Sequence, residues 1–138
     1  MKTFKTWDDI QIAYQEWGGA TASSPPVVLH HGFVADANAN WVAPGVVDAL
    51  VAGERHVVAP DARGHGRSEK PHDPSRYGEQ LMARDLAGPL AVRPEVLVAA
   101  LPSATLKLVS GNHMAAVADP QFAQAIVEFV ALGDQADG

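Results

Sequence analysis

Two short, mostly apolar runs, each ending abruptly in a polar, glycine-rich loop, constrain the fold of this chain most strongly. Residues 27–29 lead into a loop at residues 30–33, and residues 56–59 lead into a loop at residues 61–68. Buried parallel strands read as short apolar runs, and their carboxyl ends meet at one edge of the sheet. We therefore expect five polar side chains to gather at that edge: His30, His31, Asp61, Arg63 and His65.

The remaining segments predict one α/β domain over residues 1–138. Residues 2–7 and 10–17 alternate with a period of two around Asp8-Asp9, which predicts an antiparallel hairpin. Residues 104–109 form a third apolar run. The expected architecture is a reduced, mostly parallel sheet with an N-terminal antiparallel hairpin and flanking helices. Helical spacing, turn signals and caps predict those helices at residues 43–53, 77–90, 94–101 and from 120 onward.

Two of these helices carry expected boundary signals. Asn38 or Asn40 could cap the helix at residues 43–53, and Gly53 would end it. Gly88-Pro89 should break or kink the helix at residues 77–90.

Charge and composition exclude several classes of function. The net charge of −6, with no basic run, argues against a nucleic-acid binder. The absence of cysteine excludes disulfides, thiolate nucleophiles and cysteine-based zinc sites. No apolar stretch reaches the roughly 20 residues needed to span a bilayer, and residues 1–7 do not read as a signal peptide. We expect a cytoplasmic protein that acts on a small molecule.

Four motifs, in order along the chain, resemble the α/β-hydrolase superfamily. His31-Gly32-Phe33 is similar to the family's oxyanion-hole loop, and residues 61–68 (Asp-Ala-Arg-Gly-His-Gly-Arg-Ser) are similar to its D-x-R-G-x-G-x-S loop. Residues 77–86 resemble the helix before the nucleophile strand. Gly111-Asn112-His113, followed by Asp119-Pro120, resembles the segment that carries the catalytic histidine. The resemblance implies that His113 is the general base.

The chain departs from this family at the nucleophile. None of its serines lies in a G-x-S-x-G motif, so it resembles a truncated member that lacks the nucleophile elbow, the cap and the triad-acid segment. Loss of the elbow strand would leave an apolar sheet edge that must be covered or paired. Either residues 104–109 fill that place or two chains pair, and we expect a homodimer, with or without exchanged elements.

If residues 104–109 do fill it, His113 joins the other imidazoles. We therefore predict a site for Zn²⁺, Mn²⁺ or Fe²⁺ whose ligands are His31, Asp61, His65 and His113. A metal-bound water would be the nucleophile, and Arg63 would stabilise negative charge. This predicts a metal-dependent phosphoesterase, with phosphodiesters favoured. His30 or His72 could join the site.

Structural interpretations compete with each assignment. The family resemblance alone explains His31, His65 and His113. Asp61 could cap its loop, Arg63 is more often an ion-pair partner, and His30 could be a hydrogen-bonded core residue. Two other functions also fit. One is a non-catalytic remnant or a designed minimal scaffold. The other is a metal-free esterase in which His113 is the general base and the Gly32 and Phe33 amides bind the oxyanion.

Overall fold

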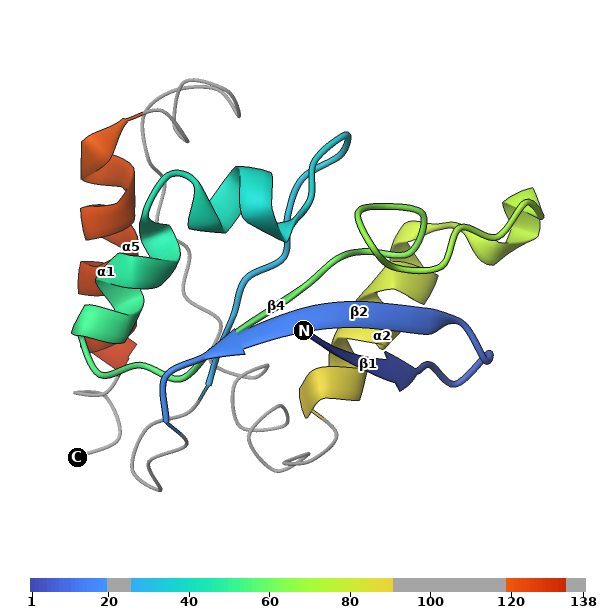
Figure 1. The fold of residues 1–138 in the computed structure, drawn as a ribbon, viewed down its shortest axis with the longest axis horizontal. Coiled ribbons are helices and arrows are strands. Elements are labelled where there is room, and N and C mark those ends of the chain that lie inside the picture. The colour runs from blue at the N-terminus through green and yellow to red at the C-terminus, as the bar shows by residue number, and fades with distance from the viewer. Residues whose placement is uncertain (20–25, 91–118, 134–138) are drawn as a thin grey trace.

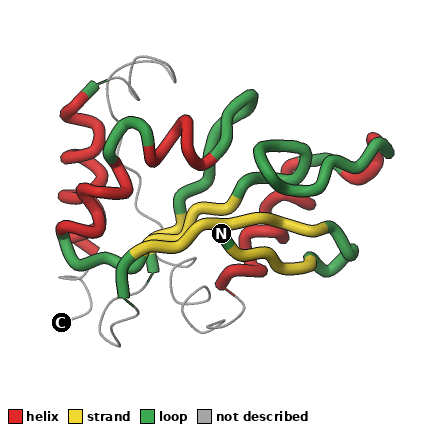
Figure 2. The backbone as a smooth tube through the Cα atoms, viewed as in Figure 1, coloured by secondary structure: helices red, strands yellow, loops and turns green. Residues whose placement is uncertain are grey.

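A computed structural model describes residues 1–19, 26–90 and 119–133 of the chain. Its sheet contains four strands: β1 (Lys2–Lys5), β2 (Gln11–Trp17), β3 (Val27–Val28) and β4 (Val57–Pro60), in the order β1-β2-β4-β3 (Figures 1 and 2). The β1–β2 and β2–β4 pairs are antiparallel, and the β3–β4 pair is parallel. The sheet is therefore mixed within the described residues, and the predicted α/β class and N-terminal hairpin are confirmed.

The hairpin forms around a tight turn at Asp8-Asp9. Asp9 has a φ of 71°, a left-handed conformation that Asp tolerates better than most residues. Thr6 closes the turn, because its hydroxyl accepts a hydrogen bond from the Ile10 amide at 3.0 Å. Period-two alternation then points Ile12 into the core, where only 1% of it is exposed.

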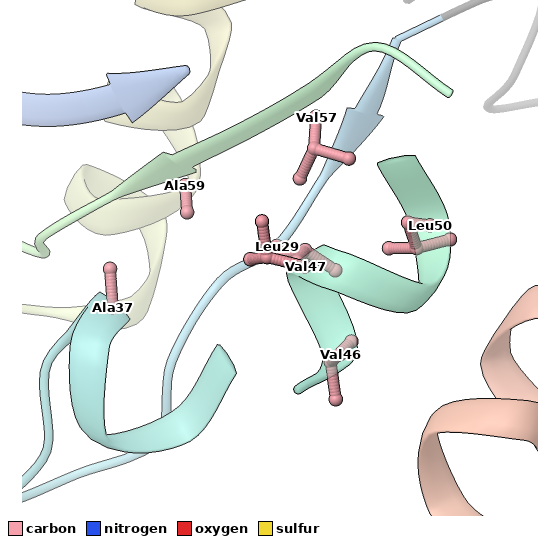
Figure 3. Packing of buried hydrophobic residues seen from close by; sticks show 7 residues of the cluster. All are labelled: Leu29, Ala37, Val46, Val47, Leu50, Val57 and Ala59. Atoms are coloured by element: carbon pink, nitrogen blue, oxygen red, sulfur yellow. The ribbon is translucent and has the colours of Figure 1, made fainter. Parts of the chain in front are cut away.

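The two faces of β4 contact different helices. Val57 and Ala59 belong to a cluster of buried residues on the face covered by α1 (Val46–Ala52) and α5 (Pro120–Gly133). Pro60, the next residue after Ala59, lines a small pocket with Met82 and Leu86 from α2 (Glu79–Leu90). Figure 1 shows α1 and α5 side by side and α2 separate from both. Figure 3 shows the cluster, which consists of Leu29, Ala37, Val46, Val47, Leu50, Val57 and Ala59.

Helix α1 presents the predicted apolar side to the sheet but begins later than expected. Val46 and Leu50 lie one turn apart and are fully buried. Residues 38–42, expected to hold a cap, instead form a π-helical turn, and α1 starts after Gly45, whose φ is 80°. Glycine adopts this left-handed conformation without steric cost, so it allows the chain to change direction between the two helical segments.

The other helices agree with the sequence pattern where the structure describes them. Helix α2 continues to Leu90, so Gly88-Pro89 lies in its last turn and does not break it earlier. Helix α5 begins at Pro120, as predicted, and Phe122 stacks on Trp41 with ring centroids 6.4 Å apart. The predicted helix at 94–101, strand at 104–109 and turn at 110–113 lie outside the described residues. No helix in the described part of the chain is long and apolar enough to cross a membrane.

Strand β3 lies at the edge of the sheet formed by the described residues. Its one neighbour in the described sheet is β4, which lies between β2 and β3 and is fully buried. Only a single chain is described, so the homodimer expected from the sequence stays a prediction.

Candidate functional site

Three imidazoles gather where β3 and β4 end, as the sequence predicts. The rings of His30 and His31 stack with centroids 5.6 Å apart, and the ring of His65 lies 5.3 Å from that of His31. The Phe33 ring meets His65 at 6.0 Å in an edge-to-face arrangement. His113, which was also predicted to belong to the site, lies outside the described residues.

His31 is the centre of this row, and both of its ring nitrogens are engaged. Nε2 accepts a hydrogen bond from the Ala62 amide at 2.9 Å, so the ring proton is on Nδ1. Nδ1 in turn donates to the Gly32 carbonyl at 2.9 Å. The side chain is buried, with 4% exposed. His31 therefore joins the ends of the two parallel strands, and its one lone pair is already used within the protein.

Both carboxylate oxygens of Asp61 accept hydrogen bonds from backbone amides. Its Oδ1 accepts from the Ala37 amide and its Oδ2 from the Arg67 amide, both at 2.9 Å. The Asp61 carbonyl accepts from the Ser68 hydroxyl at 2.6 Å. Asp61 thus caps its loop and connects that loop to the segment before the π-helical turn, which is the structural interpretation of this residue.

These contacts bear on the predicted metal cofactor. A ligand must offer a free electron pair. A backbone amide occupies the single lone pair of the neutral His31 ring, and each carboxylate oxygen of Asp61 already accepts one hydrogen bond from a backbone amide. No group of three His, Asp or Glu side chains among the described residues could hold a metal ion. The prediction of a Zn²⁺, Mn²⁺ or Fe²⁺ cofactor was wrong because spacing along the sequence does not show which lone pairs the fold itself uses.

Arg63 lies at the centre of a buried ion-pair network and is fully inaccessible. Nε and Nη2 donate to the two carboxylate oxygens of Asp85 at 2.7 and 2.6 Å. Nη1 and Nη2 donate to Asp8 at 3.0 Å, and Nη1 also donates to the Arg76 carbonyl at 2.6 Å. All five N–H donors of the guanidinium are therefore used within the protein. This geometry favours the structural role of Arg63 over contact with a substrate.

The network shifts the ionisation of its members. The hydrogen bond from Arg63 is the main cause that lowers the pKa of Asp8 to about 2, while the hydrogen bond to Asp85 is the main cause that raises the pKa of Arg63. Asp8 and Asp85 were not identified from the sequence. They lie 55 and 22 residues from Arg63, and only a close approach of hairpin, loop and α2 brings them together.

Acid should weaken this network. The pKa of Asp8 lies below its ordinary 3.8 in the fold, so its ion pair stabilises the protein above about pH 4, and this contribution is lost as the pH falls through about 2. We expect the thermal unfolding midpoint of the wild type to fall over that range. Asp8→Asn should have a lower midpoint at pH 7 and a flatter pH dependence between 4 and 2. Equal slopes for the two proteins, measured by circular dichroism, would contradict this assignment.

The loop after His31 offers one open amide where the sequence predicted two. The Gly32 amide donates to Asn40 Oδ1 at 2.8 Å. The Phe33 amide has no hydrogen-bond partner within the described ranges, and the residue is 90% exposed. Val34 has a φ of 63°, which is strained for a β-branched residue. Such strain concentrates at functional loops, and here it lies next to the Phe33 amide, which has no partner among the described residues.

His30 lies in the row of imidazoles and not in the core, and His72 lies on the surface, the position that the sequence favoured for it. His30 is exposed at the rim of the small pocket lined by Pro60 and Met82, so it is not a core histidine. Partial burial lowers the pKa of His30, and the neighbouring imidazoles of His31 and His65 lower it further. His72 lies exposed in the loop before residues 74–76.

Comparison with known proteins shows consistent similarity to one family. A sequence model described as the alpha/beta hydrolase fold matches residues 25–120. A non-heme chloroperoxidase of Streptomyces lividans is 38% identical over 86 residues, which is 60% of this chain and 29% of that protein. A bifunctional esterase/perhydrolase of Acinetobacter calcoaceticus is 37% identical over 81 residues, covering 56% and 28% respectively.

Solved structures agree. Epoxide hydrolase A from Mycobacterium thermoresistibile superimposes with a TM-score of 0.58 at 33% identity, covering 66% of this chain and 27% of that one. The chain thus spans less than a third of the length of these relatives. None of the three is named as a phosphoesterase. Together with the occupied lone pair of His31 and the lack of a metal-binding group among the described residues, this shows that the predicted metal-dependent phosphodiesterase activity was wrong.

Proposed function

The chain belongs to the α/β-hydrolase family, and from this premise we propose that it hydrolyses small carboxylic esters without a metal ion, with water as the nucleophile. Hydrolysis is the chemistry shared by the esterase and epoxide hydrolase relatives. An ester fits because its carbonyl oxygen becomes negatively charged on attack and needs a hydrogen-bond donor. The observation that carries this proposal is the open Phe33 amide on the strained loop after β3.

The Phe33 amide would stabilise the oxyanion of the tetrahedral intermediate. A preorganised backbone N–H aimed at the developing charge contributes a factor of about 10²–10³ in rate when it is the donor removed. Asn40 supports the loop by holding the preceding Gly32 amide at 2.8 Å. His31, bonded on both sides, fixes the position from which this loop leaves the sheet.

Water is the proposed nucleophile because the 138 residues contain no G-x-S-x-G motif. A water molecule needs a general base to remove its proton. The family resemblance assigns that role to His113, which lies outside the described residues. Its assignment stays a prediction, and loss of turnover in His113→Ala would support it.

Removal of the Phe33 N–H tests the proposal directly. Phe33→Pro lacks the donor, and we expect kcat on p-nitrophenyl acetate to fall by about 10²–10³-fold. Phe33→Ala removes the same aromatic ring but keeps the amide, so its kcat should fall by much less. Equal activity of the two variants would argue against an oxyanion contact at this amide.

A chelator provides the second half of the test. Incubation with EDTA followed by removal of the chelate should leave the rate unchanged, because the proposed reaction needs no metal ion. A rate that is lost with EDTA and restored by a divalent ion would contradict the proposal.

A non-catalytic scaffold is the alternative, and the saturated contacts of the site favour it. Every donor of Arg63 and both carboxylate oxygens of Asp61 bond within the protein. The absence of turnover by the wild type over a panel of short esters would favour this alternative over hydrolysis.

A further inference from the structure

Three imidazoles, those of His30, His31 and His65, form a row at the ends of β3 and β4. Among them, only His65 has both a fixed orientation and a ring nitrogen without a partner in the described residues. Its Nδ1 lies 3.1 Å from the Arg63 carbonyl. A carbonyl oxygen only accepts, so Nδ1 carries the proton and Nε2 carries the lone pair. Nε2 has no hydrogen-bond partner among residues 1–19, 26–90 and 119–133, and the side chain is half-buried. This is the tautomer that a general base requires.

The anchor of His65 is rigid. The Arg63 carbonyl belongs to a residue that is fully buried and held by Asp8 and Asp85. A base that is oriented through Nδ1 keeps Nε2 in one direction and loses little freedom when it reacts. The other two histidines of the row lack this combination. His31 uses both nitrogens, and His30 makes no orienting hydrogen bond within the described part of the chain.

His65 also lies beside the proposed oxyanion donor. Its ring contacts the Phe33 ring edge-on, with centroids 6.0 Å apart and planes at 71°. The residue with the open amide and the residue with the free lone pair are therefore neighbours at the carboxyl end of the sheet. Ester hydrolysis by water needs these two groups together, one for the developing oxyanion and one for the proton of the attacking water.

We propose that His65, through Nε2, is the general base of the ester hydrolysis proposed above, an inference that rests on that function. Nε2 takes a proton from water as the water oxygen forms a bond to the ester carbon. The carbonyl electron pair moves to oxygen, where the Phe33 amide binds it. The intermediate then re-forms the carbonyl and breaks the bond to the alcohol oxygen, which takes the proton from the imidazolium. The products are a carboxylic acid and an alcohol, and His65 returns to its starting form.

This inference competes with the assignment of the base to His113. His65→Phe keeps an aromatic ring against Phe33 but has no nitrogen. We expect its kcat on p-nitrophenyl acetate to fall by about 10²-fold or more, with KM and the unfolding midpoint little changed. His72→Phe removes an exposed imidazole from a loop away from the row and is the matched control, with the activity of the wild type.

Chemical rescue separates a base from a packing residue. His65→Ala should be as slow as His65→Phe, and free imidazole added to the solution should restore a saturable part of its rate, above the rate of imidazole alone. The wild type should not be accelerated in this way. Rescue would not occur if His65 only supported the Phe33 ring.

The outcomes distinguish the two proposals. If Phe33→Pro is inactive but His65→Phe keeps the rate of the wild type, the base is elsewhere and only the inference about His65 fails. If His65→Ala is slow but imidazole does not restore it, His65 acts through packing and the inference also fails. If the wild type shows no turnover, the proposed function fails and this inference fails with it.

Discussion

Replacement of Arg63 with methionine is expected to lower the free energy of unfolding by about 3–5 kcal/mol. Methionine fills a similar volume but leaves the carboxylates of Asp8 and Asp85 without their cation. Side-chain exposures of 9% and 6% mean that water cannot easily replace the lost partner. Removal of one member of a buried ion pair is costly for this reason, even where the intact pair contributes little.

Arg76 offers a matched control for this substitution. Its Nη1 also approaches Asp8, at 3.6 Å, and donates to the Asp8 carbonyl at 2.9 Å, but its side chain is 45% exposed. Exposed ion pairs contribute about 0–1 kcal/mol, so Arg76→Met should destabilise the protein by about 1 kcal/mol or less. Urea denaturation of both variants at pH 7 and one salt concentration measures the difference. An effect below about 1 kcal/mol for Arg63→Met would show that the network is not a main source of stability.

The parts of the fold that follow from periodicity were predictable from the sequence. Alternation in residues 2–17 predicted the hairpin, and the spacing of Val46, Val47 and Leu50 predicted the buried side of α1. The apolar runs before His30 and Asp61 predicted two parallel neighbours whose ends meet. These features depend on the local pattern of apolar and polar residues and on the burial of apolar side chains away from water. They can therefore be predicted without knowledge of individual contacts.

The chemistry of the site was less predictable, because it depends on which polar groups the backbone already uses. Nothing in the sequence shows that the Ala62 amide donates to His31 Nε2, or that Asn40 Oδ1 accepts a hydrogen bond from the Gly32 amide. Each such contact removes a group from the list of those free to react. The metal prediction was wrong because it treated His31 as free to bind an ion. By the same criterion, the Phe33 amide and the Nε2 lone pair of His65 are unbonded within the described residues.

A comparable limit applies to the start of α1. Asn38 and Asn40 are good capping residues by type. In the structure Asn40 is engaged with the Gly32 amide and Asn38 accepts from the Gln15 side chain at 3.2 Å. Because their side chains make these tertiary hydrogen bonds, neither asparagine caps α1. Gly45, in a left-handed conformation, is the N-cap residue instead.

Gly66→Ala should be the second strongly destabilising substitution, with a loss of about 2–5 kcal/mol. Gly66 has a φ of 47°, a conformation that costs an L-residue about 1–2 kcal/mol. A Cβ at this position would also overlap the Asp61 carboxylate. That carboxylate has little room to move, because it accepts hydrogen bonds from the Ala37 and Arg67 amides at 2.9 Å. Overlap with a fixed group adds about 1–3 kcal/mol.

Gly45→Ala separates the two causes. Gly45 has an equally left-handed φ of 80°, but a Cβ there would meet no atom within 4 Å. Its substitution should therefore cost only the backbone strain of about 1–2 kcal/mol. Urea denaturation of the two variants should give a clearly larger loss for Gly66→Ala, and Gly66→Ala combined with Asp61→Ala should lose less than the sum of the single changes, since the overlapping group is then absent. Equal losses for Gly66→Ala and Gly45→Ala would mean that Asp61 moves freely, and the loop that carries His65 would then lack the fixed cap assigned to it here.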